Sequence, residues 1–199
     1  MGFRSVHASI LRPFAKIARG VFGIIIQFYD EVNKKRGLQW EASRSVSVVS
    51  AGDKIYSVIH IGSKDVDLKA RVIGATGGGA IGRAYKIQDS DVTLSSPVKW
   101  YNYNSKITGQ PETTLHDENG IVFNTPVVNL AIETNKIHAD IFAITNIQNQ
   151  GKGVTLQAFG GNHILAPDDY ILLELESYDA SQDITAKLDI YEGGLDFYP

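Results

Sequence analysis

The stretch that decides the fold is residues 154–199, which read VTLQAFGGNHILAPDDYILLELESYDASQDITAKLDIYEGGLDFYP. From Ile184 to Tyr191 apolar and polar residues alternate, and a period of two places one row on a buried sheet face and the other in water. Residues 171–176 begin apolar on both faces, which predicts a strand that is covered twice. The pattern predicts a C-terminal hairpin of two long antiparallel strands, whose dry face a second sheet from the rest of the chain must cover.

The rest of the chain supplies short strand-like runs separated by turn residues such as Gly, Asn, Asp and Pro. The predicted strands are 45–49, 56–61, 67–73, 80–86, 98–102, 121–128, 136–146, 153–158, 170–176 and 184–192. We therefore expect an all-β fold, an antiparallel β-sandwich of jelly-roll type preceded by an extended N-terminal arm. An immunoglobulin-like sandwich with fewer strands is the alternative.

The charge distribution divides the chain into two parts. Residues 1–44 carry eight basic and three acidic side chains, a net charge of +5, and the remaining eleven basic and nineteen acidic side chains give −8. We expect residues 1–44 to form a basic, partly apolar docking arm and residues 45–199 to form the sandwich. Because the arm is too short to make its own core, its apolar strand, residues 21–32, must add to a sheet of its own domain or of a neighbouring subunit. The predicted docking residues are Arg12, Lys16, Arg19, Phe22, Ile24 and Ile26.

Composition sets bounds on the class of protein. The chain has 199 residues, 43% hydrophobic and 21% charged, so it can bury a core and is not globally disordered. It contains no cysteine, which excludes disulfides and thiolate metal sites and fits a reducing compartment. We expect a soluble chain without a secretory signal, because the longest early apolar run, residues 21–26, is far shorter than the ~20 residues that span a membrane.

The sequence contains no convincing catalytic motif. GGGAIG at 77–82 matches the letters of a dinucleotide-binding turn, but no amphipathic helix follows it, so a flexible loop between strands is the better interpretation. The acidic pairs lack the spacing of a calcium loop, and no serine or lysine stands in the context of a nucleophile. We expect no enzyme activity, no metal and no cofactor.

An aromatic segment, Trp100-Tyr101-Asn102-Tyr103-Asn104, is the candidate for surface recognition. Aromatic rings next to amides offer flat apolar area with polar edges, which suits stacking on a sugar or contact with a protein. We single out Trp100, Tyr101 and Tyr103. Core packing of Trp100 explains that residue equally well, and the sequence leaves both interpretations open.

Five segments carry a resemblance to a known group of proteins. They are GSK at 62–64, LKAR at 68–71, GGGAIGRAY at 77–85, NQGKG at 149–153 and IYEGGLD at 190–196. Over residues 45–199 the chain resembles small β-sandwich virion structural proteins of tailed bacteriophages, of the head-decoration or fibre type.

The resemblance implies a non-enzymatic structural protein of the virion, assembled in the host cytoplasm: a capsid decoration, head fibre or head/tail attachment protein. The expected partners are the chain itself, as a homo-oligomer with a trimer favoured, and another capsid or tail protein, but no nucleic acid and no membrane. The alternative is a receptor- or glycan-binding module of a phage fibre, with a host surface glycan as its ligand.

Overall fold

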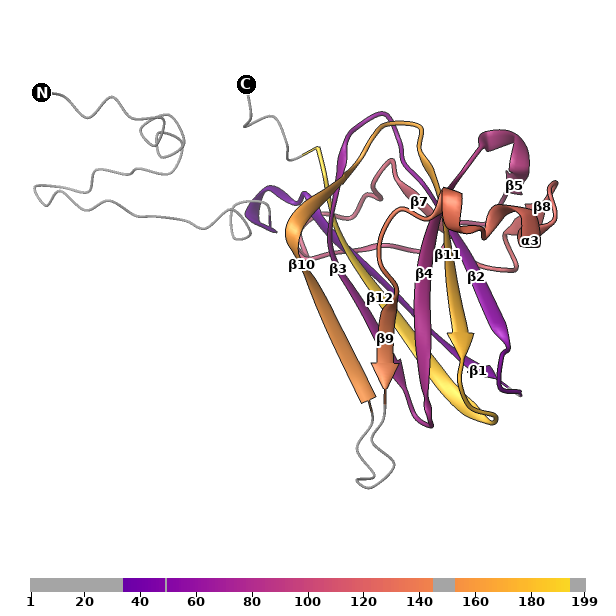
Figure 1. Cartoon of the computed structure of the whole chain (residues 1–199). Helices are drawn as coiled ribbons and strands as arrows, with labels where there is room; N and C mark the ends of the chain where they lie inside the picture. The colour runs from indigo at the N-terminus through magenta and orange to yellow at the C-terminus, as the bar shows by residue number, and fades with distance from the viewer. Residues whose placement is uncertain (1–33, 49, 145–152, 194–199) are drawn as a thin grey trace, which may run out of the picture.

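The computed structural model describes residues 34–48, 50–144 and 153–193, which form two antiparallel sheets packed face to face (Figure 1). The first sheet has the strand order β10-β3-β12-β1-β6, and the second has the order β7-β2-β11-β4-β9. The first sheet consists of β1 (Gln39–Val48), β3 (Val66–Ala75), β6 (Tyr101–Asn102), β10 (Gly153–Leu165) and β12 (Gln182–Glu192). The second consists of β2 (Lys54–His60), β4 (Gly79–Ile87), β7 (Thr114–His116), β9 (Ile141–Ile144) and β11 (Tyr170–Ser177).

The topology is that of a jelly roll. Strands β1 to β4 and β9 to β12 make the body, with β1-β12-β3-β10 in one sheet facing β2-β11-β4-β9 in the other. Consecutive strands of this body therefore fall in opposite sheets, except β4 and β9, which pair with each other, and each sheet is assembled from strands far apart in the sequence. The predicted all-β sandwich of jelly-roll type is confirmed, in preference to the immunoglobulin-like alternative.

The predicted C-terminal hairpin is wrong in its pairing. β11 pairs with β2 and β4, whereas β12 pairs with β1 and β3, so the two strands are central strands of opposing sheets. Their alternation is nevertheless as predicted up to Ile190, because Ile184, Leu188 and Ile190 are buried while Thr185 is exposed. At Tyr191 the prediction is wrong, since this residue was assigned to the row in water and is only 1% exposed. A period of two identifies the buried face of a strand but not its neighbours, and both arrangements bury the same row.

The connection between β4 and β9 covers the outer face of the second sheet. It contains a small sheet of β5 (Val92–Leu94) and β8 (Ile121–Phe123), the short helix α3 (Val127–Leu130), and the 3-10 turns Asp89–Asp91 and Glu133–Asn135. Val92, Ile121 and Leu130 of this insertion form an apolar cluster with Val58 and Leu172 of the sheet. Since Ile171 belongs to the core between the sheets, the start of β11 is covered on both faces, as predicted.

Three predicted strands are shorter than expected. The run 98–102 is strand only at Tyr101–Asn102. In the run 121–128 the strand ends at Phe123 and a helical turn follows Pro126, which has no N–H to offer to a ladder. In the run 136–146 only Ile141–Ile144 is strand among the described residues. The preceding residues form a β-bridge with β4 only between Tyr85 and Lys136, and Asp140 forms ion pairs with Lys136 (2.5 Å) and with Arg83 of β4 (3.4 Å).

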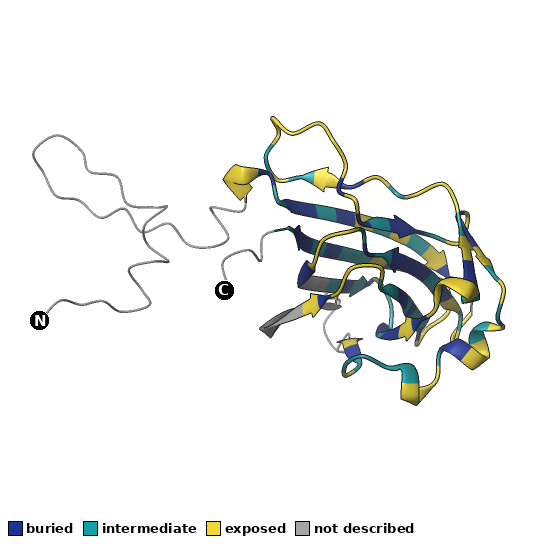
Figure 2. Cartoon of the chain, turned by 90° about the horizontal axis from the view of Figure 1, so that it is seen from above, coloured by how far each residue is buried: buried dark blue, intermediate teal, exposed yellow. Residues whose placement is uncertain are grey.

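The boundary predicted between residues 44 and 45 falls inside β1. That strand begins at Gln39 and keeps regular register with β12 over all of its ten residues. Trp40 and Ala42, assigned to the arm by sequence, are buried in the core between the sheets. The sandwich therefore includes residues 39–44, because Trp40 and Ala42 share the buried row with Val48. Figure 2 shows such buried positions along the strands and exposed ones mainly in the loops.

The GGGAIG segment consists of the end of a turn, residues 77–78, and the first four residues of β4. Gly77 and Gly78 follow β3, and Gly79 begins β4, so a strand stands where a dinucleotide-binding turn needs a helix. The backbone N–H of Gly77 donates to the Gln182 side chain (3.1 Å) and that of Gly78 to Asp179 (3.0 Å). The predicted loop is confirmed at residues 76–78, where hydrogen bonds hold it to the β11–β12 connection.

Candidate functional site

The predicted docking residues Arg12, Lys16, Arg19, Phe22, Ile24 and Ile26 lie outside the described residues. The surface that could receive them is the outer edge of β1, which does belong to the described residues. β6 pairs with β1 only at Trp40 and Glu41. Beyond that point no described strand pairs with β1 on the side away from β12. We call residues 43–48 the open β1 edge.

The direction of the backbone groups on this edge follows from two hydrogen bonds. Gln39 O accepts from Tyr103 N on the β6 side (3.1 Å), and Leu38 O accepts from Glu192 N on the β12 side (3.0 Å). Because both main-chain groups of one residue in an antiparallel strand point the same way, odd-numbered residues face outward from the sheet edge. Ser43, Ser45 and Ser47 thus present their N–H and C=O groups at the open β1 edge.

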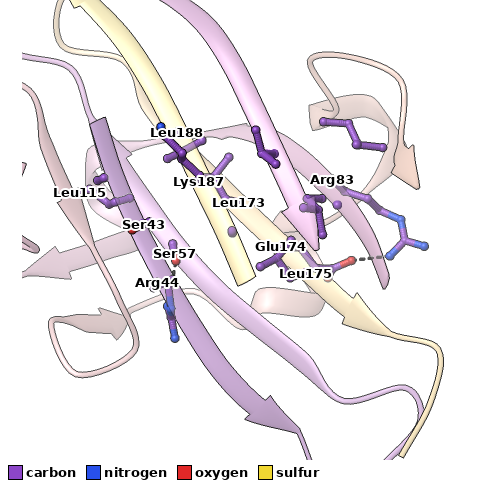
Figure 3. A pocket seen from close by; sticks show the side chains of 16 residues that line it. Ser43, Arg44, Ser57, Arg83, Leu115, Leu173, Glu174, Leu175, Lys187 and Leu188 are labelled. Carbon is purple, nitrogen blue, oxygen red and sulfur yellow. Dashed lines mark hydrogen bonds and ion pairs between the residues drawn. The ribbon is translucent and has the colours of Figure 1, made fainter. Parts of the chain in front are cut away.

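The facing edge strand of the second sheet, β2, has its free edge contacted by a side chain. β7 pairs with β2 at Val58, Ile59 and His60 only, which leaves residues 54–57 without a strand neighbour on that side in the described chain. Arg44 reaches across from β1 and donates to Tyr56 O (3.3 Å) and Ser57 Oγ (3.0 Å), as Figure 3 shows for Ser57. Its guanidinium also pairs with Glu118. Arg44 therefore bridges the mouth of the sandwich between the two edge strands.

Behind this mouth the two sheets enclose a small apolar cavity of about 50 Å³ (Figure 3). Its walls include Leu173 and Leu175 of β11 and Leu188 of β12, together with Leu115 of β7. A volume of this size has room for only a few water molecules, and its mainly apolar lining offers them few partners. The cavity is a packing feature of the core and not a binding site for an organic ligand.

The outer face of the second sheet carries a network of ion pairs around Glu174, whose side chain is 1% exposed. Arg83 Nη1 lies 2.7 Å from Glu174 Oε1 and 2.5 Å from Glu176 Oε2. Lys54 Nζ approaches the other Glu174 oxygen at 3.2 Å, and Arg83 Nε lies 3.4 Å from Asp140 Oδ2. The strand pairing β2-β11-β4 creates this arrangement, because Tyr56, Glu174 and Arg83 are register neighbours.

The network perturbs the groups around it. Burial is the largest influence on Arg83 and lowers its pKa, but the hydrogen bonds with Glu176 and Glu174 outweigh it, so its pKa lies above the ordinary value. Burial, with the negative charge of Glu174, raises the pKa of Tyr56 to about 12. The carboxylates are neutralised by cations, which suits a structural role better than proton transfer.

Within residues 34–48, 50–144 and 153–193 no group of three or more His, Asp or Glu side chains is placed to hold a metal ion. In the same part of the chain no helix is long and apolar enough to cross a membrane.

The three aromatic candidates for recognition differ in how far their side chains are exposed. Trp100 is only 2% exposed and belongs to the core cluster, so a surface role for its ring is wrong and the core interpretation holds. Tyr101 is 57% exposed, with Lys99 Nζ 5.1 Å from its ring centre. Tyr103 is 38% exposed, but its hydroxyl donates to Asp189 (3.0 Å) and accepts from Lys187 (3.1 Å). Only Tyr101 presents a largely free ring.

A recess of about 310 Å³ is lined in part by the residues that immediately precede Tyr101 in the sequence. Its walls are residues 97–100 and part of the segment 110–114. Gln110 holds these two segments together, since its side chain bonds both the N–H (2.9 Å) and the C=O (3.0 Å) of Trp100. The buried Nε1–H of Trp100 has no hydrogen-bond partner within the described residues.

Comparisons with known proteins add little. No family model matches the chain, and no curated protein matches its sequence. A solved structure of the infectious bursal disease virus VP2 subviral particle is 13% identical, with a TM-score of 0.17, over 76% of this chain and 39% of that one. T=1 particles derived from the same virus give 11% identity over 76% and 40%, with a TM-score of 0.16. The chain spans about two fifths of the length of those chains, and TM-scores this low carry no weight for its function.

Sequence reasoning missed two features of the site. The open β1 edge depends on how far β6 extends along β1, which long-range pairing decides. The burial of Glu174 was also missed, because alternation alone assigns it to an exposed face. The nearby Arg83 offered no signal, since their contact joins strands about ninety residues apart in the sequence.

Proposed function

We propose that the chain is a non-enzymatic structural component of a virus particle, which multimerises and docks through its N-terminal residues. The proposed particle is that of a tailed bacteriophage, where the chain would be a capsid decoration, head fibre or head/tail attachment protein. A homotrimer is the favoured assembly, with a capsid or tail protein as the second partner.

The observation that carries this proposal is the open β1 edge on a jelly-roll body. Jelly rolls recur in viral capsids and in lectins, so the fold leaves an assembly role and a binding role open. An uncovered strand edge is a template for pairing with another chain, and natural proteins normally cover or charge such edges. The paired carboxylates around Glu174 give no competing catalytic site.

Deleting residues 1–20 tests the docking role. Because these residues precede the sandwich and carry Arg12, Lys16 and Arg19, we expect a folded, soluble protein that no longer joins the particle. Circular dichroism would report the retained β-structure, and incorporation would be measured by quantifying the protein in purified particles. Incorporation at the level of the full chain would show that docking depends on other residues.

A receptor- or glycan-binding module is the second candidate function. It is favoured by the exposed ring of Tyr101, which directly follows in the sequence the residues 97–100 that line the recess. Exposed aromatic rings bind sugars by stacking, and a neighbouring cation such as Lys99 would add preference for acidic sugars.

A glycan array separates the two functions. A binding module should give signals that Tyr101→Ala abolishes and that Tyr178→Ala preserves, because Tyr178 is 46% exposed but lies in the β11–β12 connection. A structural protein should give no signal with any variant. Binding that survives Tyr101→Ala would place the sugar site elsewhere.

A further inference from the structure

We propose that the open β1 edge receives the apolar strand at residues 21–32 of a second copy of this chain, which adds to the first sheet by β-augmentation. This inference rests on the proposed function and specifies the surface through which copies join. The receiving surface is residues 43–48, and the contact is a ladder of main-chain hydrogen bonds to Ser43, Ser45 and Ser47.

The open β1 edge lacks the devices that keep strand edges from pairing. Its register with β12 is unbroken from Gln39 to Val48, so no bulge twists it away, and it contains no proline or lysine. Its only charged side chain, Arg44, is turned inward onto β2. The β2 edge, by contrast, has Lys54 on it and Arg44 bonded to its backbone at Tyr56. The contrast indicates that the β1 edge is kept open for a partner strand.

The chain's own residues 21–32 are poorly placed to fill this edge. Before β1 the chain turns at Gly37 (φ +74°), and Asn102 and Asn104 bond its backbone at Gly37 O (2.7 Å) and Lys35 O (3.0 Å). A hairpin return from this turn would need the edge positions at Trp40 and Glu41, which β6 occupies. Passing β6 to reach Ser43 means covering ~20 Å, or about six residues of extended chain, which would leave half of the predicted strand unpaired.

The residue pattern of the arm matches the edge. In antiparallel pairing, side chains of facing residues lie on the same side of the sheet. A row formed by Phe22, Ile24 and Ile26 would thus extend the inward row of Ala42 and Val46 beside the mouth of the sandwich. The alternate residues of the arm, such as Gly23 and Ile25, would lie on the exposed face beside Ser43, Ser45 and Ser47. The open β1 edge borders the core between the sheets, and a strand with an apolar inward face would cover the core there.

Charge supports the same occupant. Glu118, whose side chain is 51% exposed, stands at the mouth beside Arg44, and Asp183 is exposed at the end of β1 opposite Ser47. Arg12, Lys16 and Arg19 precede the apolar strand by a few residues. An arm that pairs along this edge brings its basic stretch close to these carboxylates, which would steer the encounter between copies.

Disulfide trapping in the full chain tests the inference, because the chain contains no cysteine of its own. Copies with the single substitution Ser45→Cys are co-produced with differently tagged copies that carry Gly23→Cys, Ile25→Cys or Gln27→Cys. Facing residues of a ladder are about 5.5 Å apart at Cα, within the range of a disulfide. We expect one of the arm variants to form a mixed disulfide with the Ser45→Cys copy on a non-reducing gel.

The other outcomes overturn the inference. Bonds only between two Ser45→Cys copies would mean that the β1 edges pair with each other. A further chain carries Ser45→Cys together with one of the arm substitutions. A bond within this chain, without bonds between copies, would mean that the arm completes its own sandwich, and no bond at all would mean that the edge stays empty. Particle incorporation is scored in parallel. Incorporation without the mixed disulfide refutes this inference alone, and the mixed disulfide without incorporation refutes the virion role alone.

A charge at the edge gives a second readout with a matched control. Ser45→Lys puts an ammonium group on the open β1 edge, whereas Thr185→Lys puts the same charge on the same exposed face, directly opposite Ser45 but one strand inward. We expect Ser45→Lys to convert the assembled protein to monomers in sedimentation velocity and Thr185→Lys to leave it assembled. Equal behaviour of the two variants would contradict pairing at this edge.

Discussion

Replacing Arg83 with methionine is expected to lower the free energy of unfolding by about 3 kcal/mol. The loss would leave Glu174, which is 1% exposed, with only Lys54 as a cationic partner, and Glu176 would lose its contact at 2.5 Å. An uncompensated buried charge costs far more than the ion pair itself contributes. Chemical denaturation followed by circular dichroism measures the change.

Lys86→Met is the matched control for this variant. Lys86 lies on the same strand as Arg83 and also forms a short ion pair, with Asp169 at 2.6 Å, but its side chain is 51% exposed. An exposed pair contributes less than about 1 kcal/mol, so this variant should unfold close to the unmodified protein. Equal losses in the two variants would show that the Glu174 network is not effectively buried.

The second large effect is expected for Leu188→Asp. Leu188 is 8% exposed in the core between the sheets, directly opposite Ala42 of β1, and it borders the apolar cavity. A carboxylate there loses its hydration without gaining a partner, which should cost about 4 kcal/mol or prevent folding. Thermal unfolding by calorimetry would show the loss.

Thr185→Asp, on the exposed row of the same strand, should change stability by less than about 0.5 kcal/mol. Lys187 is a poorer control than its outward position suggests, because its Nζ lies 2.5 Å from Glu41 and 3.6 Å from Asp189. Reversing its charge would gather three carboxylates. If Leu188→Asp and Thr185→Asp melt alike, the register of β12 described above is wrong.

The class of fold could be predicted from local pattern, but the pairing could not. Alternation from Ile184 to Ile190 identifies a strand with one buried row, and the apolar start of β11 identifies double coverage. Neither pattern says that β11 and β12 lie in opposite sheets, since the choice of neighbours depends on contacts with β1, β2, β3 and β4. The boundary at residue 44 failed for a related reason. The change in charge there does not coincide with the start of β1 at Gln39.

The candidate site was only partly predictable. The apolar content of residues 21–32 predicts that the arm needs a sheet to pair with, but it does not predict which strand edge is free. The edge is open because β6 is only two residues long and because the Arg44 side chain points inward to β2. Both features depend on tertiary structure. Trp100 shows the converse, because an aromatic residue in a polar segment suits a surface and a core equally, and only its burial decides.

Sedimentation velocity of the purified full chain tests the central claim most directly. If copies join through the arm and the open β1 edge, the protein should sediment as a defined oligomer of its 21.8 kDa chain, with three copies favoured, and Ser45→Pro should sediment as a folded monomer. Proline at this position removes only the N–H that faces the edge and spares the ladder with β12. A full chain that sediments as a monomer, or a Ser45→Pro variant that assembles like the unmodified protein, would contradict the account.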